Sequence, residues 1–362
     1  MYSLPKERAL RKICFHGVSI VYENNVHVIH HTNLIHESIG TIMRALASPA
    51  YGTLESLRIV DLPMPEPGPG QVRIRVHTSA LNPADFKSIT GEAKILHARV
   101  FPMVMGFDFS GVIDALGKNV SGFGRGDEVF GHLPYGRATR LGAFAEYTLA
   151  NANAIAKKPV GIKHAIAAAS ATSGLTALQS LRDIGKLSSG GKVLIIGAAG
   201  GVGSVAVGVA QKLGARVTAI CATHAVDFVE DLGADEVIDR LKFSPLQTAR
   251  GHFNVIFDTA AASSWKASHR LIEKGGAYVT TLPSIAFLWD KLASIVTPTR
   301  AHFVIVKPRA DDFNLLGIWL SQGLKVPIFQ TVKVKDVAAG LKRLQAGGVH
   351  GRIVVDVAGG WN

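Results

Sequence analysis

The segment from residue 193 to residue 221 constrains the fold of this chain more than any other. It begins with a run of large apolar residues, passes through a turn that contains Gly200 and Gly203, and continues as a helical pattern up to residue 213. A second apolar run follows Gly214. The order strand, glycine turn, helix and strand predicts the first βαβ unit of a dinucleotide-binding fold.

Each glycine of this turn has its own expected role. Gly200 lets the backbone approach a pyrophosphate, and Gly203 lets the helix pack closely on its strand. The helix N-terminus then presents free N–H groups to the phosphates. Ala198 stands where the motif usually has its first glycine. We therefore predict a cofactor site that includes Ala198, Gly200, Gly201, Val202 and Gly203.

Length and composition set the class of protein. With 362 residues, of which 48% are hydrophobic, the chain is long enough for two domains with substantial cores. Its only two cysteines, Cys14 and Cys221, exclude a disulfide framework and a cysteine-rich zinc site, which fits a reducing compartment. The formal net charge of +12 is spread along the chain. It suits either a polyanionic cofactor or a generally basic protein, and nucleic acid less well.

No apolar stretch is long enough to predict a membrane span. The nearest candidate, 284–306, is interrupted by Asp290, Lys291 and Arg300. Its pattern predicts a helix followed by a buried strand over 302–306.

The chain divides into three kinds of sequence. Residues 1–42 hold five of the 14 histidines and show no sustained periodicity. They are interpreted as an upstream extension preceding a true start at Met43, as a targeting segment, or as a disordered arm, and the first is favoured. Short strands with glycine turns are predicted over 71–160 and a helix over 165–181. From residue 192, strands and helices alternate, with strands predicted at 236–239, 254–258, 276–280 and 351–356.

Several ordered passages resemble one known family. They are residues 71–76, 81–87, 105–112, 126–131, 142–147, 174–179, 233–239 and 275–279. Together with the glycine turn they are similar to the medium-chain dehydrogenase/reductase superfamily, and within it to the quinone oxidoreductase branch that includes zeta-crystallin. The resemblance covers roughly 43–358.

This resemblance implies an α/β protein in which a doubly wound Rossmann sheet is inserted into a GroES-like, β-rich catalytic domain. The catalytic domain would comprise 43–165 and 307–362, and the Rossmann NADP-binding domain 166–306. Residues 1–42 would be disordered or absent from the mature fold. The nicotinamide would lie in the cleft between the two domains, and a homodimer would form through Rossmann edge strands such as 303–306.

The residues at the zinc-ligand positions differ from those of the zinc-dependent relatives. Those relatives use a cysteine, a Gly-His-Glu motif and a further thiolate or carboxylate. Here the cysteine position is Asn82, and the motif reads Gly106, Phe107, Asp108. Asparagine and phenylalanine cannot replace a thiolate and an imidazole. We therefore expect a metal-free enzyme that transfers hydride to a quinone or an α,β-unsaturated carbonyl, because such acceptors are already electron-poor.

The residues after the second Rossmann strand favour NADPH over NADH. An acidic residue there would bind the ribose 2′-OH of NAD, but none occurs before Asp227. Thr223 can donate to a phosphate oxygen, and His224 can add positive charge. Arg240 is either a second phosphate partner or a solvated surface residue.

Residues near the nicotinamide are assigned by resemblance. Asn82 would bond the cofactor or the substrate carbonyl, or else cap the turn before Pro83. Thr176 would lie near the nicotinamide, or bond its own helix backbone. Asp85 is interpreted as structural. An apolar wall for a flat acceptor, or simply core packing, is expected from Phe86, Phe107 and Tyr135.

Three further residues are expected at the cofactor. Thr259 and Leu282 follow Rossmann strands at their carboxyl ends, the edge where a doubly wound sheet binds ligands. Arg352 resembles the basic residue before the last strand of the family and is expected to approach the cofactor.

Two alternative functions stay open. One is a 2-enoyl-thioester reductase, although the tyrosine that this branch uses as a proton donor is absent from 80–110, and Tyr51 lies too early. The other is a cofactor-binding protein with little turnover that binds RNA or has a structural role. The expected location is cytoplasmic, or mitochondrial if residues 1–42 are a targeting segment.

Overall fold

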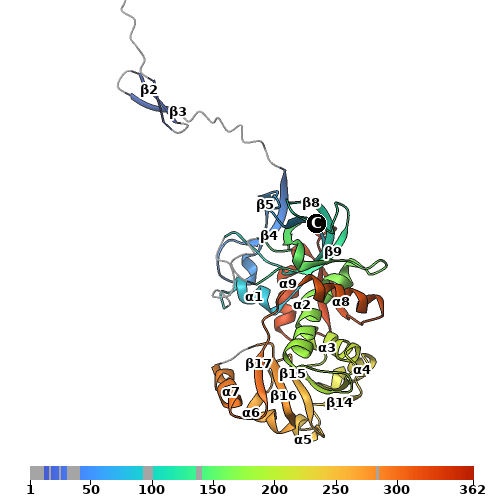
Figure 1. Ribbon diagram of the computed structural model, residues 1–362. Coiled ribbons are helices and arrows are strands. Elements are labelled where there is room, and N and C mark those ends of the chain that lie inside the picture. The colour runs from blue at the N-terminus through green and yellow to red at the C-terminus, as the bar shows by residue number, and fades with distance from the viewer. Residues whose placement is uncertain are drawn as a thin grey trace, which may run out of the picture. The chain divides into compact units, whose positions relative to one another are not determined.

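The computed structural model describes residues 12–15, 18–23, 26–30, 41–92, 101–135, 141–282 and 285–362. The chain forms two units, Met1–Ile42 and Met43–Asn362. In the first unit, three strands pair antiparallel in the order β1-β2-β3 (Figure 1). They are β1 (Lys12–Phe15), β2 (Val18–Glu23) and β3 (Val26–His30). None of these three strands was predicted from the sequence.

The second unit begins with the β-rich part. Its larger sheet has the order β11-β9-β8-β6-β19-β18, with β10 also paired to β6, and its smaller sheet has the order β5-β4-β7. The larger sheet contains β6 (Gln71–Ala80), β8 (Asp108–Leu116), β9 (Glu128–His132), β10 (Tyr147–Asn151), β11 (Ile155–Lys157), β18 (Ile328–Lys333) and β19 (Arg352–Asp356). The smaller contains β4 (Ile42–Ser48), β5 (Arg58–Pro63) and β7 (Met103–Val104). Because β19 pairs with β6, the end of the chain completes a sheet that its first part begins.

The remaining sheet is parallel throughout and has the order β14-β13-β12-β15-β16-β17. This is the doubly wound Rossmann order, which reverses direction at its first strand. Its strands are β12 (Lys192–Ile196), β13 (Arg216–Cys221), β14 (Glu236–Asp239), β15 (Phe253–Asp258), β16 (Ile272–Thr280) and β17 (Arg300–Phe303). The last strand begins and ends earlier than the predicted range 302–306, because its register with β16 starts at Arg300.

Helices cover the sheets and connect the parallel strands (Figure 1). They are α1 (Pro83–Ile89), α2 (His164–Leu178), α3 (Gly201–Lys212), α4 (Val226–Asp231), α5 (Pro245–Thr248), α6 (Trp265–Ser268), α7 (Ile285–Ile295), α8 (Ala310–Ser321) and α9 (Val337–Gln345). A π-helical segment, Gln179–Ile184, continues α2. None of the described helices combines the length and apolar character that crossing a bilayer would require.

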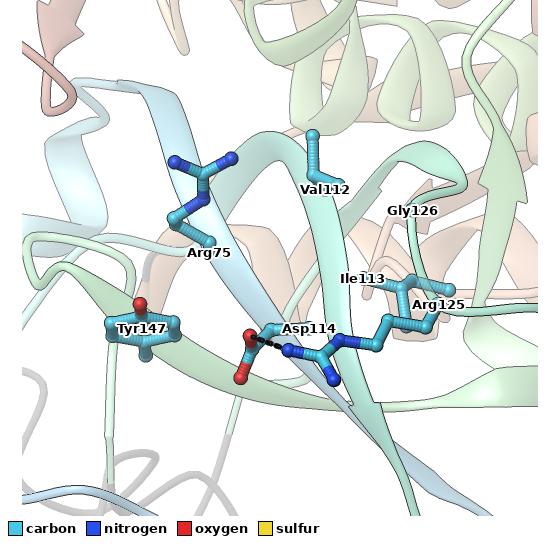
Figure 2. A pocket seen from close by; sticks show the side chains of 7 residues that line it. All are labelled: Arg75, Val112, Ile113, Asp114, Arg125, Gly126 and Tyr147. Atoms are coloured by element: carbon cyan, nitrogen blue, oxygen red, sulfur yellow. Dashed lines mark ion pairs between the residues drawn. The ribbon is translucent and has the colours of Figure 1, made fainter. Parts of the chain in front are cut away.

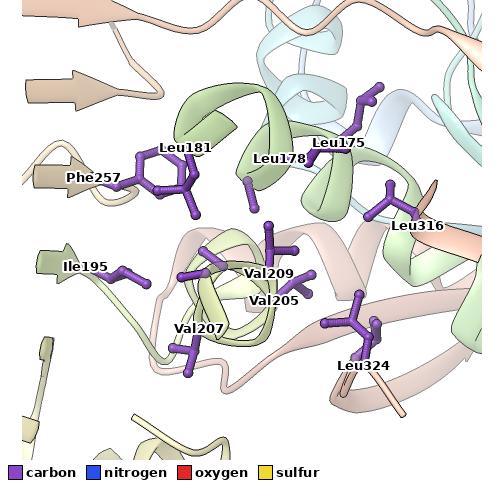
Figure 3. Packing of buried hydrophobic residues seen from close by; sticks show 14 of the residues in the cluster. Leu175, Leu178, Leu181, Ile195, Val205, Val207, Val209, Phe257, Leu316 and Leu324 are labelled. Carbon is purple, nitrogen blue, oxygen red and sulfur yellow. The ribbon is translucent and has the colours of Figure 1, made fainter. Parts of the chain in front are cut away.

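α2 is the central packing element of the second unit. All its residues from Ala167 to Leu178 are buried, as expected of a helix with neighbours on every side. Figure 3 shows Leu175 and Leu178 of α2 facing Val205 and Val209 of α3, with Leu316 of α8 close by. A second apolar cluster fills the β-rich part. Tyr135 packs against both clusters, which places it where the two parts of this unit meet.

Candidate active site

The glycine turn joins β12 to α3 with the geometry that a dinucleotide site needs. Gly197 has a φ of +81°, and Gly200 is the N-cap of α3. A Cβ on Gly203 would lie 2.2 Å from the Gly197 carbonyl oxygen, so only glycine permits this close packing. A Cβ on Gly200 would meet only that same oxygen, at 3.4 Å. The space beside Gly200 is therefore open to a pyrophosphate, while Ala198 is fully buried.

Arg352 links the glycine turn to the β-rich part. The Gly351 amide donates to the Ala199 carbonyl at 2.9 Å, and a Cβ on Gly201 would lie 3.1 Å from Arg352 Cδ. The guanidinium then reaches away from the turn. Its Nη1 donates to Asn82 Oδ1 at 3.0 Å, and its Nη2 to Asp108 Oδ2 at 2.6 Å. Arg352 thus lies beside the predicted cofactor site, with its charge directed to the carboxylate of Asp108.

Asp108 is the centre of a buried polar network. Oδ2 accepts from Arg352 and, at 3.0 Å, from Asn82 Nδ2. Oδ1 accepts from the Thr172 amide at 2.8 Å and from the Thr172 hydroxyl. Burial opposes ionisation of this carboxyl, but the hydrogen bond from His132 and the charge of Arg352 hold its pKa below the usual value. Asp108 is therefore ionised and accepts all of these bonds.

The hydrogen-bond pattern fixes the tautomer of His132. The Thr172 hydroxyl has one proton and donates it to ionised Asp108. His132 Nδ1, 2.8 Å from the same hydroxyl oxygen, must then be the donor in that contact. The other ring nitrogen, Nε2, is buried and has no hydrogen-bond partner among the described residues. Neither Thr172 nor His132 belongs to a motif that would mark it in the sequence as a member of this network.

Hydrogen bonds of Asn82 and Asp85 stabilise the start of α1. The Asn82 amide donates to Asp85 Oδ2 at 2.7 Å, and the Gly106 amide donates to Oδ1 at 3.0 Å. Burial raises the pKa of Asp85 to about 7, against the effect of these two amides. Asp85 therefore connects two backbone segments. The Asn82 side chain already bonds Asp108, Arg352 and the Ala80 carbonyl.

This donor set does not fit a catalytic zinc ion. Asn82 and Phe107 stand at two of the ligand positions of zinc-dependent relatives, and neither side chain replaces a thiolate or an imidazole. Within the described ranges, no three His, Cys, Asp or Glu side chains gather into a group that could hold a metal. Asn82 and Asp108 instead bond Arg352.

The remaining predicted residues around the nicotinamide position have defined partners. The Thr176 hydroxyl donates to the Thr172 carbonyl at 2.6 Å, the helix-backbone bond that was its alternative reading. Phe107 is buried and meets the Tyr135 ring edge-on, with centroids 4.7 Å apart. Phe86 is half-buried in the same apolar cluster. Burial, with the charges of Asp108 and Asp85, raises the pKa of Tyr135.

The predicted adenosine end contains a carboxylate that the sequence analysis overlooked. The Thr223 hydroxyl donates to Asp239 Oδ1 at 3.0 Å, so it is already bonded. Asp239 ends β14, the third strand, whereas an acidic residue was sought only after the second. His224 and Arg240 are exposed, and the His224 ring stacks on His350.

Thr259 and Leu282 lie at the carboxyl edge of the Rossmann sheet. The Thr259 hydroxyl donates to the Ile196 carbonyl at 2.8 Å and to that of Gly197 at 3.2 Å, which braces the glycine turn. Leu282 is 42% exposed. Residues 93–100, 136–140 and 283–284 lie outside the described residues.

A separate pocket of about 350 Å³ lies on the β-rich sheet, and Figure 2 shows its lining. It is lined by Arg75, Val112, Ile113, Asp114, Arg125, Gly126 and Tyr147. Arg125 forms an ion pair with Asp114 at 3.7 Å. None of the predicted site residues lines this pocket.

Comparison with known proteins places the chain in a family. Residues 68–160 match the alcohol dehydrogenase GroES-like domain, and residues 232–355 match the zinc-binding dehydrogenase family. The chain is 29% identical over 330 residues to the 2-methylene-furan-3-one reductase of Solanum lycopersicum, covering 88% of this chain and 80% of that protein. It is 30% identical over 311 residues to the NAD(P)H oxidoreductase RTN4IP1, mitochondrial, of Bos taurus, covering 79% and 76%.

A solved structure agrees with these matches. The quinone oxidoreductase from Coxiella burnetii superposes with a TM-score of 0.79 at 26% identity, covering 87% of this chain and 99% of that one. The fold, the family matches and the relatives all indicate the same family. The chain belongs to the medium-chain dehydrogenase/reductase superfamily, within its quinone oxidoreductase branch.

Proposed function

We propose that this protein reduces quinones or α,β-unsaturated carbonyl compounds with NADPH, without a catalytic zinc ion. The observation that carries this proposal is the bonding of Asn82, Asp108 and Arg352 to one another at the ligand positions of zinc-dependent relatives. Without a Lewis acid, the enzyme needs an acceptor that is already electron-poor. The names of the Solanum relative and the Coxiella structure support this substrate class.

The chain's own residues would bind and orient the reactants. The open space beside Gly200 and the N-terminus of α3 would hold the pyrophosphate. Phe107 and Tyr135 would form an apolar wall for a flat acceptor. When bound, the reduced nicotinamide supplies the hydride, and the acceptor spreads the resulting charge over its conjugated system.

We also propose that the protein prefers NADPH to NADH. His224 and Arg240 are exposed cationic or protonatable side chains beside the end of β13, and they support NADPH. Asp239 opposes it, because a carboxylate there can accept from a ribose 2′-OH. We expect NADPH to bind more tightly than NADH, and Asp239→Asn to widen the difference.

Two glycine variants test the cofactor site. A Cβ at Gly200 meets only the Gly197 carbonyl oxygen, at an ordinary contact distance of 3.4 Å, so Gly200→Val is expected to fold and to lose NADPH binding. Gly203→Val collides with the Gly197 carbonyl and is expected to destabilise the protein instead. Fluorescence titration with NADPH and thermal unfolding separate the two effects. Unchanged NADPH affinity in folded Gly200→Val would refute the assigned site.

We further propose a homodimer formed through β17 and α7. β17 ends the Rossmann sheet and pairs only with β16 among the described strands. The adjoining α7 exposes four apolar side chains, Leu288, Trp289, Leu292 and Ile295, and Val296, directly after the helix, is exposed as well. An unpaired edge strand beside an exposed apolar helix favours association with a second copy.

Light scattering of two matched variants tests this dimer. Leu292→Glu places a charge in the α7 face and is expected to give monomers. Leu241→Glu changes a leucine that is similarly exposed, at 62%, but lies after β14 on the opposite edge of the sheet, and should not change the mass. A dimer that persists in Leu292→Glu would contradict the proposed interface.

We propose a cytoplasmic location, supported by the presence of only two cysteines, with the mitochondrion as the alternative. The name of the Bos taurus relative supports that alternative. Fluorescent fusions with and without residues 1–42 distinguish the two, since only a targeting segment would move the protein to mitochondria.

A further inference from the structure

We infer that His224 and His350 form a paired site for the 2′-phosphate of NADPH, and that binding of this phosphate draws one proton onto the pair. This inference rests on the proposed use of NADPH. His350, near the C-terminal end of the chain, would join His224 in the phosphate site, and the affinity for NADPH would then depend on pH.

The two imidazole rings are stacked. Their centroids are 5.1 Å apart, and their planes differ by 10°. Phe228 of α4 lies 5.4 Å from the His350 ring at an angle of 27°. Contacts with two other rings hold His350 in one orientation, so its position does not depend on a bound ligand.

The stack lies beside the predicted phosphate site. His224 follows β13, whose carboxyl end adjoins the glycine turn, since the Gly197 and Ala198 amides both donate to the Ile220 carbonyl at 3.1 Å. His350 precedes Gly351, whose amide bonds Ala199 of that turn. Both histidines are therefore tied through the backbone to the strand and turn that would hold the adenosine half of the cofactor.

His350 has an unused polar atom at this place. Its Nε2 is buried and has no hydrogen-bond partner among the described residues. An unpartnered buried nitrogen costs free energy unless a ligand or a proton uses it. Because protein atoms cover this nitrogen, a proton on it would attract the phosphate through its charge, beside the exposed ring of His224.

Charges around the pair determine when it is protonated. Burial, followed by the influence of His224 and Arg343, lowers the pKa of His350. The Arg343 guanidinium donates to the carbonyls of Gly347 and Gly348, in the loop that carries His350. The other charged groups on the elements around the stack are Asp227, Glu230 and Asp231 of α4, Asp239 at the end of β14 and Arg240 after it.

These charges make protonation of the histidine pair depend on whether NADPH is bound. Without cofactor, burial, the neighbouring His224 ring and Arg343 together disfavour a proton on His350. Two imidazolium rings at this separation would repel each other, so a charge on one ring disfavours a charge on the other. The dianionic 2′-phosphate supplies the opposite charge and reverses the balance. NADPH, but not NADH, should therefore bind more tightly as the pH falls.

Titration of the full chain with NADPH and NADH at about pH 8 and about pH 6.5 tests the inference. The variant His350→Phe keeps a ring in the stack and removes the titrating group. We expect NADPH affinity in the wild type to rise about five-fold toward the lower pH, and in His350→Phe to stay flat or fall slightly. Protonation of the phosphate itself affects both proteins equally.

His269→Phe is the matched control, because His269 also lies against an aromatic ring, that of Trp265 at 5.0 Å, but outside this site. It should behave like the wild type. An equal pH dependence in His350→Phe and the wild type would overturn the inference. Equal affinities for NADPH and NADH at about pH 8 would instead refute the proposed preference for NADPH, which is a separate outcome from loss of the pH dependence.

Discussion

Arg352 and Asp108 are 244 residues apart in the sequence and form an ion pair at 2.6 Å in which both side chains are buried. The pair stands beside Asn82, at the ligand positions of zinc-dependent relatives. A buried carboxylate would be costly alone, but here a guanidinium, an amide and a hydroxyl satisfy it. This arrangement gives the site a fixed, internally balanced charge where those relatives hold a metal.

Removal of one partner should be strongly destabilising. Asp108→Ala leaves the Arg352 charge buried without compensation, and we expect a loss of about 3–5 kcal/mol in the free energy of unfolding. Glu66→Ala is the control, because Glu66 pairs with Arg73 while 83% of its side chain is exposed, and it should cost less than about 1 kcal/mol. Urea unfolding measures both. Equal effects would mean that the buried pair has no special role.

Thr172 should matter through its hydroxyl. Thr172→Val removes the donor to Asp108 and the acceptor for His132 Nδ1, while keeping the shape of the side chain. We expect it to cost about 1–3 kcal/mol of stability. Thr172→Ser keeps the hydroxyl and should cost clearly less. If the serine variant is the less stable of the two, packing of the methyl group explains the residue better than the network does.

Tyr135 should act on the acceptor through its ring. Tyr135→Ala removes the aromatic partner of Phe107 and is expected to raise the KM for a flat quinone about ten-fold, with little change in NADPH affinity. Tyr135→Phe keeps the ring and should stay near the wild-type KM. Steady-state kinetics with one quinone measures the KM of both variants and of the wild type. Equal damage in both variants would instead assign the role to the hydroxyl.

Asp85 should make stability depend on pH. Its pKa is about 7 in the folded protein, above the ordinary value of 3.8, so the folded state holds a proton that the unfolded state releases. This contribution is fully present below about pH 4 and is lost as the pH rises toward 7. Asp85→Asn cannot titrate. Relative to that variant, the wild type should lose stability across this range, and parallel pH profiles would contradict the assignment.

The local parts of the site were predictable from sequence. The glycine turn, α3 and strand β14 follow from short patterns in which each residue's role depends on near neighbours. Gly203 is the clearest case, since its contact with Gly197 lies within one motif. Strand β17 was displaced from its predicted range because pairing with β16, rather than local hydrophobicity, sets where it begins.

The polar network was not predictable as a unit, because its members are distant in sequence and no motif joins them to one another. Arg352 reaches Asn82 across 270 residues and joins the tail of the chain to its first domain. Thr172 is one polar residue within a helix of small side chains, and nothing nearby marks it. Asp239 was overlooked because the pattern directs attention to the second strand, although the third strand lies beside it.

NADPH consumption by protein freed of metal with a chelator tests most directly whether the enzyme reduces its acceptor without zinc. A panel of quinones, enones and an enoyl-thioester should be run with NADPH and NADH in parallel. We predict turnover of a quinone or enone that is unaffected by the chelator and is faster with NADPH than with NADH. Turnover that disappears on chelation and returns with added zinc would contradict it.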